Sequence, residues 1–174
     1  MVAALPAVLL LVSACASGVT RPSDMASLQP ALIGAQQAGE VTIALAPEAR
    51  SAAASSTTFK QEALLAVVRQ ALEAKNELTR DKDPSLPIVE ITVTSVRTRS
   101  TFNAIMFGFM AGDDHINGDV VVRSPSGVVL QRFSVSASYA LGGFGGGRNE
   151  ARMSWLYDTF ANHLVEELTG TPSG

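Results

Sequence analysis

Residues 116–141 read INGDVVVRSPSGVVLQRFSVSASYAL and carry the clearest structural pattern of the chain. Apolar and polar residues alternate on both sides of its centre, which is the period of a half-buried strand. The centre, Ser124-Pro125-Ser126-Gly127, is a turn sequence, because proline presets φ and glycine tolerates a positive φ. The stretch therefore predicts two antiparallel strands, 116–123 and 128–141, joined as a hairpin.

Other periodic segments flank this hairpin. Alternation predicts a strand at 41–45, ended by Pro47, and another at 87–98. Apolar residues at helical spacing predict helices at about 59–75 and 149–168, the first capped by Thr57 or Thr58 and the second stopped by Gly170 and Pro172. The stretch 51–58 is small and polar and carries no such pattern.

The predicted fold class is α+β, in the order strand–helix–strand–strand–strand–helix. We expect a four-stranded, mainly antiparallel sheet with two helices packed on one face, because each helix needs a surface for its apolar side. Hydrophobic residues make up 47% of the chain and charged residues 17%. Such a chain can bury enough apolar surface to offset the entropy lost when it folds. The formal net charge of −3, without a block of basic residues, argues against nucleic acid as a partner.

The amino-terminal segment has the features of a leader. Residues 5–12 are an uncharged apolar run, followed by the small residues Ser13 and Ala14 and by Cys15, the one cysteine of the chain. The run is too short for a permanent membrane helix and has the length of the apolar region of a signal peptide. No Lys or Arg precedes it, which leaves the translation start open. The alternative is that residues 1–15 form a buried apolar helix with an inert thiol.

The sequence Val12-Ser13-Ala14-Cys15 resembles the lipobox of bacterial lipoproteins. The resemblance implies a lipid on the Cys15 sulfur, cleavage between Ala14 and Cys15, and acylation of the new terminus. Several acyl chains, at about 0.8 kcal/mol per buried CH₂, would hold the protein on a membrane durably. By the same resemblance, Ala16 in place of an acidic residue favours the outer membrane over the inner one.

The whole chain is similar to small, poorly characterised periplasmic lipoproteins of Gram-negative bacteria, in which a lipobox and a polar tether precede a compact α+β domain. We therefore expect a signal peptide at 1–14 and, from Cys15 to residue 39, a lipidated cysteine with a flexible tether. A single periplasmic domain at 40–169 and a disordered tail at 170–174 would follow.

An apolar segment interrupts the predicted sheet. Between two strands, residues 102–112 read FNAIMFGFMAG, although such connections are normally polar. One interpretation is that the segment folds under the sheet as core. The other is an adaptable, Met-rich contact surface for a partner or a membrane leaflet, made by Phe102, Ile105, Met106, Phe107, Phe109 and Met110.

Two further motifs resemble a phosphate-binding loop and a metal site, but each lacks a feature that such a site needs. The glycines of 142–147 follow a strand and precede a helix, but Arg148 and Asn149 stand where a phosphate-binding loop needs Lys and Ser/Thr, so we expect no nucleotide. Asp113-Asp114-His115 are consecutive, and alternate side chains of an extended chain point to opposite faces. We interpret them as a solvated turn, and we expect neither metal nor cofactor.

Three hypotheses of function follow. The first is a non-enzymatic accessory or scaffold component, anchored in the envelope through Cys15 and facing an unidentified envelope protein. The second is a periplasmic module that binds a lipid, glycan or peptidoglycan fragment in a pocket lined by Phe107, Phe109 or Phe144. The third, a hydrolase, requires a nucleophile within reach of His115 or His163, which no sequence motif shows.

Overall fold

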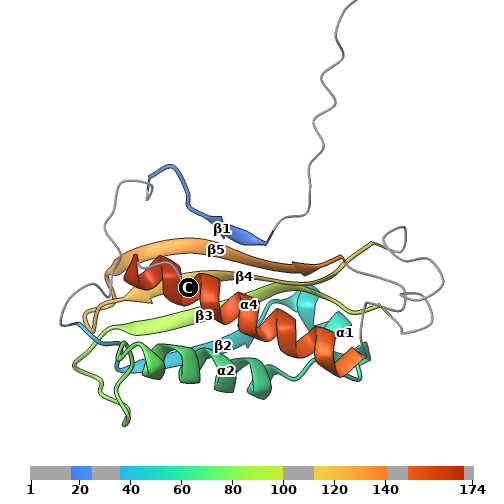
Figure 1. Cartoon of the computed structure of the whole chain (residues 1–174). Coiled ribbons are helices and arrows are strands. Elements are labelled where there is room, and N and C mark those ends of the chain that lie inside the picture. Colours follow the sequence, from blue (N-terminus) through green and yellow to red (C-terminus); the bar gives the residue numbers. More distant parts are fainter. Residues whose placement is uncertain (1–16, 25–35, 100–111, 141–148, 171–174) are drawn as a thin grey trace, which may run out of the picture.

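The computed structural model describes residues 17–24, 36–99, 112–140 and 149–170. Within these ranges lie five strands and three helices (Figure 1). The strands are β1 (Gly18–Thr20), β2 (Glu40–Leu45), β3 (Ile88–Arg97), β4 (Asp114–Arg123) and β5 (Val129–Tyr139), and the helices are α1 (Pro47–Ser55), α2 (Gln61–Ala74) and α4 (Asn149–Thr169). The α+β class is confirmed.

The strands form one mixed sheet in the order β1-β5-β4-β3-β2. The predicted hairpin is confirmed: β4 and β5 are antiparallel, and Gly127 in their turn has φ of 85°. The prediction of four strands is wrong, because β1 adds a fifth. The sheet is mainly antiparallel, as predicted, but β2 runs parallel to β3. Parallel neighbours need a long crossover, and the chain between Leu45 and Ile88 supplies it with α1 and α2.

One face of the sheet carries the core. Alternate residues of β3, β4 and β5 are buried, so they share a face, and α2 and α4 lie side by side across it (Figure 1). The largest side chains that are fully buried include Phe133, Phe160, Leu64 and Ile116. The apolar stripes predicted for the two long helices are therefore confirmed as the partners of the sheet.

Helix α1 lies where the sequence shows a small, polar stretch without periodicity. Pro47 stands in its first turn, where a missing N–H costs nothing, and only Ala49 of the helix is buried. The predicted cap of α2 by Thr57 or Thr58 is wrong as well. Lys60 occupies the cap position without a side-chain bond, and its backbone N–H donates to the Tyr157 hydroxyl of α4 at 2.7 Å.

Strand β1 falls within the stretch that the sequence assigns to a tether. It pairs antiparallel with β5, Gly18 opposite Ser136 and Thr20 opposite Ser134. After the strand, Arg21 forms an ion pair with Glu167 of α4. The chain is therefore part of the sheet from its third residue after Cys15.

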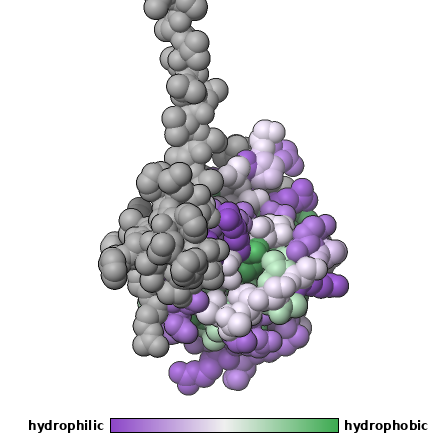
Figure 2. All heavy atoms as spheres, turned by 90° about the vertical axis from the view of Figure 1, so that its right-hand side faces the viewer, coloured by the Kyte–Doolittle hydropathy of each residue, from purple (hydrophilic) through white to green (hydrophobic). Residues whose placement is uncertain are grey.

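The face of the sheet opposite the helices is polar. Serines of β5 donate hydrogen bonds to β4 along this face, Ser134 to Asp119 at 2.7 Å and Ser136 to Asn117 at 2.9 Å. At the end of the sheet beside α1, apolar side chains of the described residues reach the surface in a small area with polar neighbours (Figure 2). Strand β5 stops and helix α4 begins at this same end of the sheet (Figure 1).

Candidate functional site

A buried network of charges lies at the end of the sheet where α4 begins. It consists of Arg99, two residues after β3, Asp114, the first residue of β4, and Arg152, in the first turn of α4. Their side chains are 2%, 2% and 4% exposed. Buried charges are costly unless they are paired, so a contact of this kind requires good geometry.

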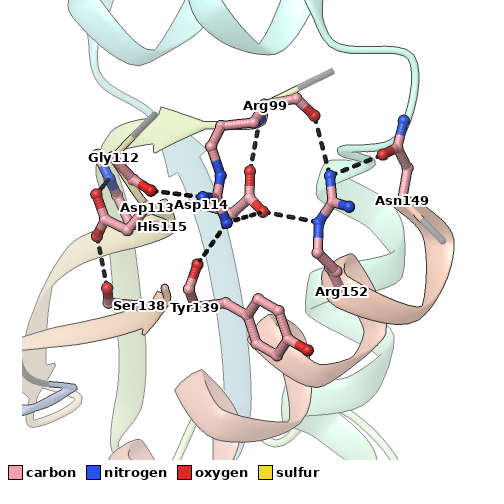
Figure 3. A network of polar contacts seen from close by, with 9 residues as sticks. All are labelled: Arg99, Gly112, Asp113, Asp114, His115, Ser138, Tyr139, Asn149 and Arg152. Carbon is pink, nitrogen blue, oxygen red and sulfur yellow. Dashed lines mark hydrogen bonds and ion pairs between the residues drawn. The ribbon is translucent and has the colours of Figure 1, made fainter. Parts of the chain in front are cut away.

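Both arginines share the Asp114 carboxylate (Figure 3). The Arg152 Nε donates to Oδ2 at 2.8 Å, and the Arg99 Nη2 donates to the same oxygen at 3.2 Å. The backbone N–H of Arg99 donates to Oδ1 at 2.5 Å. Charge-assisted bonds of this type are among the strong ones in proteins, so Asp114 holds β4, the end of β3 and α4 together.

The guanidinium groups also bind backbone and amide oxygens. Arg99 donates to the carbonyl of Gly112 at 2.5 Å and to that of Tyr139 at 3.1 Å. Arg152 donates to the carbonyl of Arg99 at 3.1 Å and to the Asn149 Oδ1 at 2.7 Å. These bonds give several N–H groups of the two guanidinium groups an acceptor inside the protein.

The positions of these acceptors show what the network connects. Arg99 and Gly112 border residues 100–111, while Tyr139 and Asn149 lie next to residues 141–148. One network therefore fixes the chain on both sides of the apolar segment and of the glycine-rich segment. All four positions lie within the same cluster of hydrogen bonds (Figure 3).

A small cavity adjoins the network. Its walls include Thr58, Thr98, Asn149 and Met153, and its volume is about 10 Å³. A space of this size holds a single water at most. This cavity is therefore too small for a ligand larger than water.

A second polar cluster occupies the opposite face of the sheet, next to the network. The Nε2 of His115 lies 3.0 Å from the Ser95 Oγ, and its Nδ1 lies 3.5 Å from the Asp113 Oδ1. Ser138 donates to the other Asp113 oxygen at 2.5 Å. Burial opposes the charged form of Asp113, but the Ser138 hydrogen bond and the charge of His115 outweigh it, so the pKa of Asp113 lies below its ordinary value.

The prediction of a solvated turn at residues 113–115 is wrong. Asp114 is buried within the network, and Asp113 and His115 are mostly covered. The premise that consecutive side chains of a strand point to opposite faces holds here, because Asp114 and His115 lie on opposite faces of the sheet. The described part of the chain contains no group of three or more His, Cys, Asp and Glu side chains placed to bind a metal ion.

Several predicted site residues lie outside the described residues. They are the lipidation and cleavage positions Cys15 and Ala14, the contact residues Phe102, Ile105, Met106, Phe107, Phe109 and Met110, and Phe144. His163 is described and lies 3.4 Å from Glu166 of its own helix. None of the helices in the described ranges has the length and apolar character to cross a membrane.

Sequence reasoning missed Arg99 and Arg152. One signal was available for Arg152, because it stands four residues before the buried Leu156 and thus on the apolar stripe of α4. A charged residue on such a stripe needs a buried partner. No comparable local pattern marks Arg99.

Comparison with known proteins gives a family match and two likenesses of fold. Residues 25–143 match the family model described as "Domain of unknown function (DUF4410)". The PelC dodecamer from Paraburkholderia phytofirmans superimposes with a TM-score of 0.50 at 13% identity, over 86% of this chain and 97% of that one. A point variant of that dodecamer gives 0.51 at 10% identity, over 87% and 98%.

A third structure is less similar. Rare lipoprotein B from Shewanella oneidensis gives a TM-score of 0.40 at 15% identity, over 76% of this chain and 95% of that one. No curated protein sequence matches the chain. At these identities the PelC structures support the fold alone.

Proposed function

The chain belongs to the DUF4410 family, whose domain has no assigned function. We propose that it is a lipid-anchored envelope protein acting as a non-enzymatic accessory or scaffold component. Two features support an envelope location. The sequence at Val12–Cys15 resembles a lipobox, and the apolar run at residues 5–12 has the length of the apolar region of a signal peptide.

The observation that carries the accessory role is the buried Arg99–Asp114–Arg152 network. It includes Arg99 and Gly112, on either side of residues 100–111, and Tyr139 and Asn149, on either side of residues 141–148, at one end of the sheet. A loop whose two ends are held in place loses less conformational entropy when it binds a partner, so binding costs less free energy. We therefore propose that the apolar side chains of 102–110 contact another envelope protein, most of all Phe107 and Phe109.

The anchor is tested by feeding cells a clickable fatty acid. The wild-type chain should incorporate label and fractionate with outer membranes, whereas Cys15→Ala should remain unlabelled and soluble in the periplasm. Ser13→Ala is the matched control, since it leaves a small residue before the cysteine and should be labelled normally. Equal labelling of wild type and Cys15→Ala would refute the lipid anchor.

The contact is tested with a photo-cross-linking amino acid. Placed at Phe107 it should give a discrete adduct with an envelope protein, whereas at Val128, the exposed turn residue at the other end of the sheet, it should give none. Phe107→Ser combined with Phe109→Ser should keep the unfolding transition of the wild type and lose this adduct. A double variant that fails to fold would mean that the segment is core.

A second candidate function, hydrolysis of an ester or amide, is favoured by the Ser95–His115–Asp113 cluster. In that chemistry the Ser95 hydroxyl attacks a carbonyl carbon while His115 Nε2 accepts its proton, and Asp113 orients the ring through Nδ1. The ester or amide bond breaks as His115 passes that proton to the departing alcohol or amine. Water, giving a proton to His115, then attacks the acyl-Ser95 ester; the acyl group leaves as a carboxylic acid, and the proton returns to the Ser95 oxygen. At 3.5 Å the Asp113–His115 contact is longer than a normal hydrogen bond, which is why the accessory role is preferred.

A fluorophosphonate probe separates the two candidates. A hydrolase should be labelled on Ser95, and labelling should disappear in Ser95→Ala but persist in Ser136→Ala, a serine of the same polar face that is bound to Asn117. The accessory role predicts that no serine is labelled above the level of the unfolded chain.

A further inference from the structure

The chain is held to the sheet very close to the proposed lipid anchor. Ser17 makes two hydrogen bonds with the backbone of Ser138 in β5: its hydroxyl accepts from the N–H at 2.8 Å and donates to the carbonyl at 3.3 Å. Strand β1 begins at the next residue and pairs with β5. The hydrogen bonds of Ser17 and the pairing of β1 therefore attach the chain to β5 from residue 17 onward.

This attachment limits how far the domain can move from a membrane. Cys15 precedes Ser17 by two residues, and two extended residues span about 7 Å. A free tether of the length first expected, about 25 residues, would instead allow an average separation near 25–30 Å. The carboxyl end of β5 must therefore stay within about one headgroup layer of the acyl chains.

An exposed aromatic side chain lies at the same end of the domain. The Tyr139 ring, next to Ser138, packs edge-on against Trp155 of α4 with 5.1 Å between the ring centroids. Trp155 remains 42% exposed. Tryptophan with an exposed ring is favoured at membrane–water interfaces, where its apolar body and its N–H both find partners.

Charge does not favour a different orientation. The chain has a net charge of −3 and no polybasic segment that would draw another face to anionic lipid. The other large hydrophobic residue that is exposed in the described ranges, Val128, lies in the β4–β5 turn. It is separated from Tyr139 by the length of β5, about 35 Å at 3.3 Å per residue.

We propose that the end of the domain formed by Ser17, Tyr139 and Trp155 rests against the lipid headgroups, with the Trp155 ring in the interface. This orientation rests on the proposed lipidation of Cys15, which supplies the anchor. The lipid surface is then a second contact of the domain, set by the short connection between Cys15 and β1.

Intrinsic fluorescence tests the orientation, because Trp155 is the one tryptophan of the chain. The lipidated protein is reconstituted into vesicles of phosphatidylethanolamine and phosphatidylglycerol, with or without phosphatidylcholine brominated near the top of its acyl chains. Emission from Trp155 should shift to the blue, lose intensity with the brominated lipid, and be shielded from aqueous acrylamide. The shift should persist at high salt, since it does not depend on surface charge.

A matched reporter defines the opposite end. In Trp155→Phe combined with Val128→Trp, the emission should be quenched by acrylamide and unaffected by the brominated lipid. Equal bromine quenching of the two reporters would overturn the orientation.

A spacer variant separates the orientation from the anchor. Insertion of about 20 Gly/Ser residues between Ala16 and Ser17 lengthens the connection to about 25 Å on average, so this variant should float with the vesicles while its Trp155 is no longer quenched by bromine. Failure of the wild type to float would refute the lipid anchor. Floatation of both proteins with the same weak quenching would refute the orientation and leave the anchor standing.

Discussion

Replacement of Asp114 by alanine is the sharpest test of the network. The change removes the carboxylate that both Arg99 and Arg152 contact and leaves two buried guanidinium groups facing each other. Breaking a buried ion pair on one side costs about 3–5 kcal/mol, because the remaining charge has lost its compensation. Domains are stable by only about 5–15 kcal/mol, so Asp114→Ala should lose a large part of the total.

The measurement is urea unfolding followed by Trp155 fluorescence. It uses the chain without its leader and with Cys15→Ala, so that acyl chains do not interfere. Urea unfolding should show the loss of about 3–5 kcal/mol directly. In a parallel thermal melt, at about 2–4 °C per kcal/mol for a chain of this length, the melting temperature should fall by roughly 10 °C.

The pair Glu90–Arg123 is the matched control. It also joins β3 to β4, with 2.7 Å between Arg123 Nε and Glu90 Oε2, but its side chains are 44% and 40% exposed. Exposed pairs contribute about 0–1 kcal/mol, so Glu90→Ala should change stability little. If Asp114→Ala costs no more than Glu90→Ala, the reasoning about the buried network is refuted.

A double variant tests the cause of the loss. Asp114→Asn keeps the shape of the side chain and removes its charge. Adding Arg152→Met then removes one of the guanidinium groups left without compensation. The two changes together should cost less than the sum of their separate effects, whereas additive costs would mean that the groups do not interact.

Three further outcomes are expected. Tyr157→Phe removes the hydroxyl that accepts from the Lys60 N–H and donates to its carbonyl, so denaturant unfolding should show a loss of about 1–3 kcal/mol; an unchanged midpoint would contradict it. Gly118→Val should cost about 1–3 kcal/mol by overpacking, because even a Cβ at this position would lie 3.1 Å from the buried Phe160 ring; a thermal melt at the wild-type temperature would disprove the close contact. The pKa of Asp113 is lowered from 3.8, so its stabilising contribution is present above that pH and is lost as the pH falls below it; an Asp113→Asn variant should lose less stability than the wild type in acid unfolding titrations, and parallel curves would argue against the lowered pKa.

Much of the fold could be predicted because its signals are local. The alternation in β3, β4 and β5 and the apolar stripes of α2 and α4 each repeat several times within one segment. The hairpin turn carries its own chemistry in Pro125 and Gly127. A helix or strand whose pattern recurs within 10 to 20 residues can be predicted without knowing which elements it packs against.

The missed elements lack such repetition. Strand β1 has three residues, and the side chain of Ser17, just before it, bonds to Ser138, 121 positions away in the chain. Helix α1 buries only Ala49, so it has no apolar stripe. The parallel pairing of β2 with β3 depends on the path of the chain through two helices rather than on the sequence of either strand.

The candidate site also has parts that the sequence shows and parts that it does not. Apolar residues 102–110 and the resemblance at Val12–Cys15 are visible in the sequence, since each is a run of neighbouring residues. The network is not, because Asp114 lies 15 positions from Arg99 and 38 from Arg152. The positions of most strands and of the two long helices follow from local sequence patterns, and lipidation at Cys15 is a prediction from the same kind of local signal. Which charges meet, and which strand Ser17 and β1 pair with, became visible in the folded chain alone, because burial and pairing between distant residues exist only after the sheet and the helices have packed.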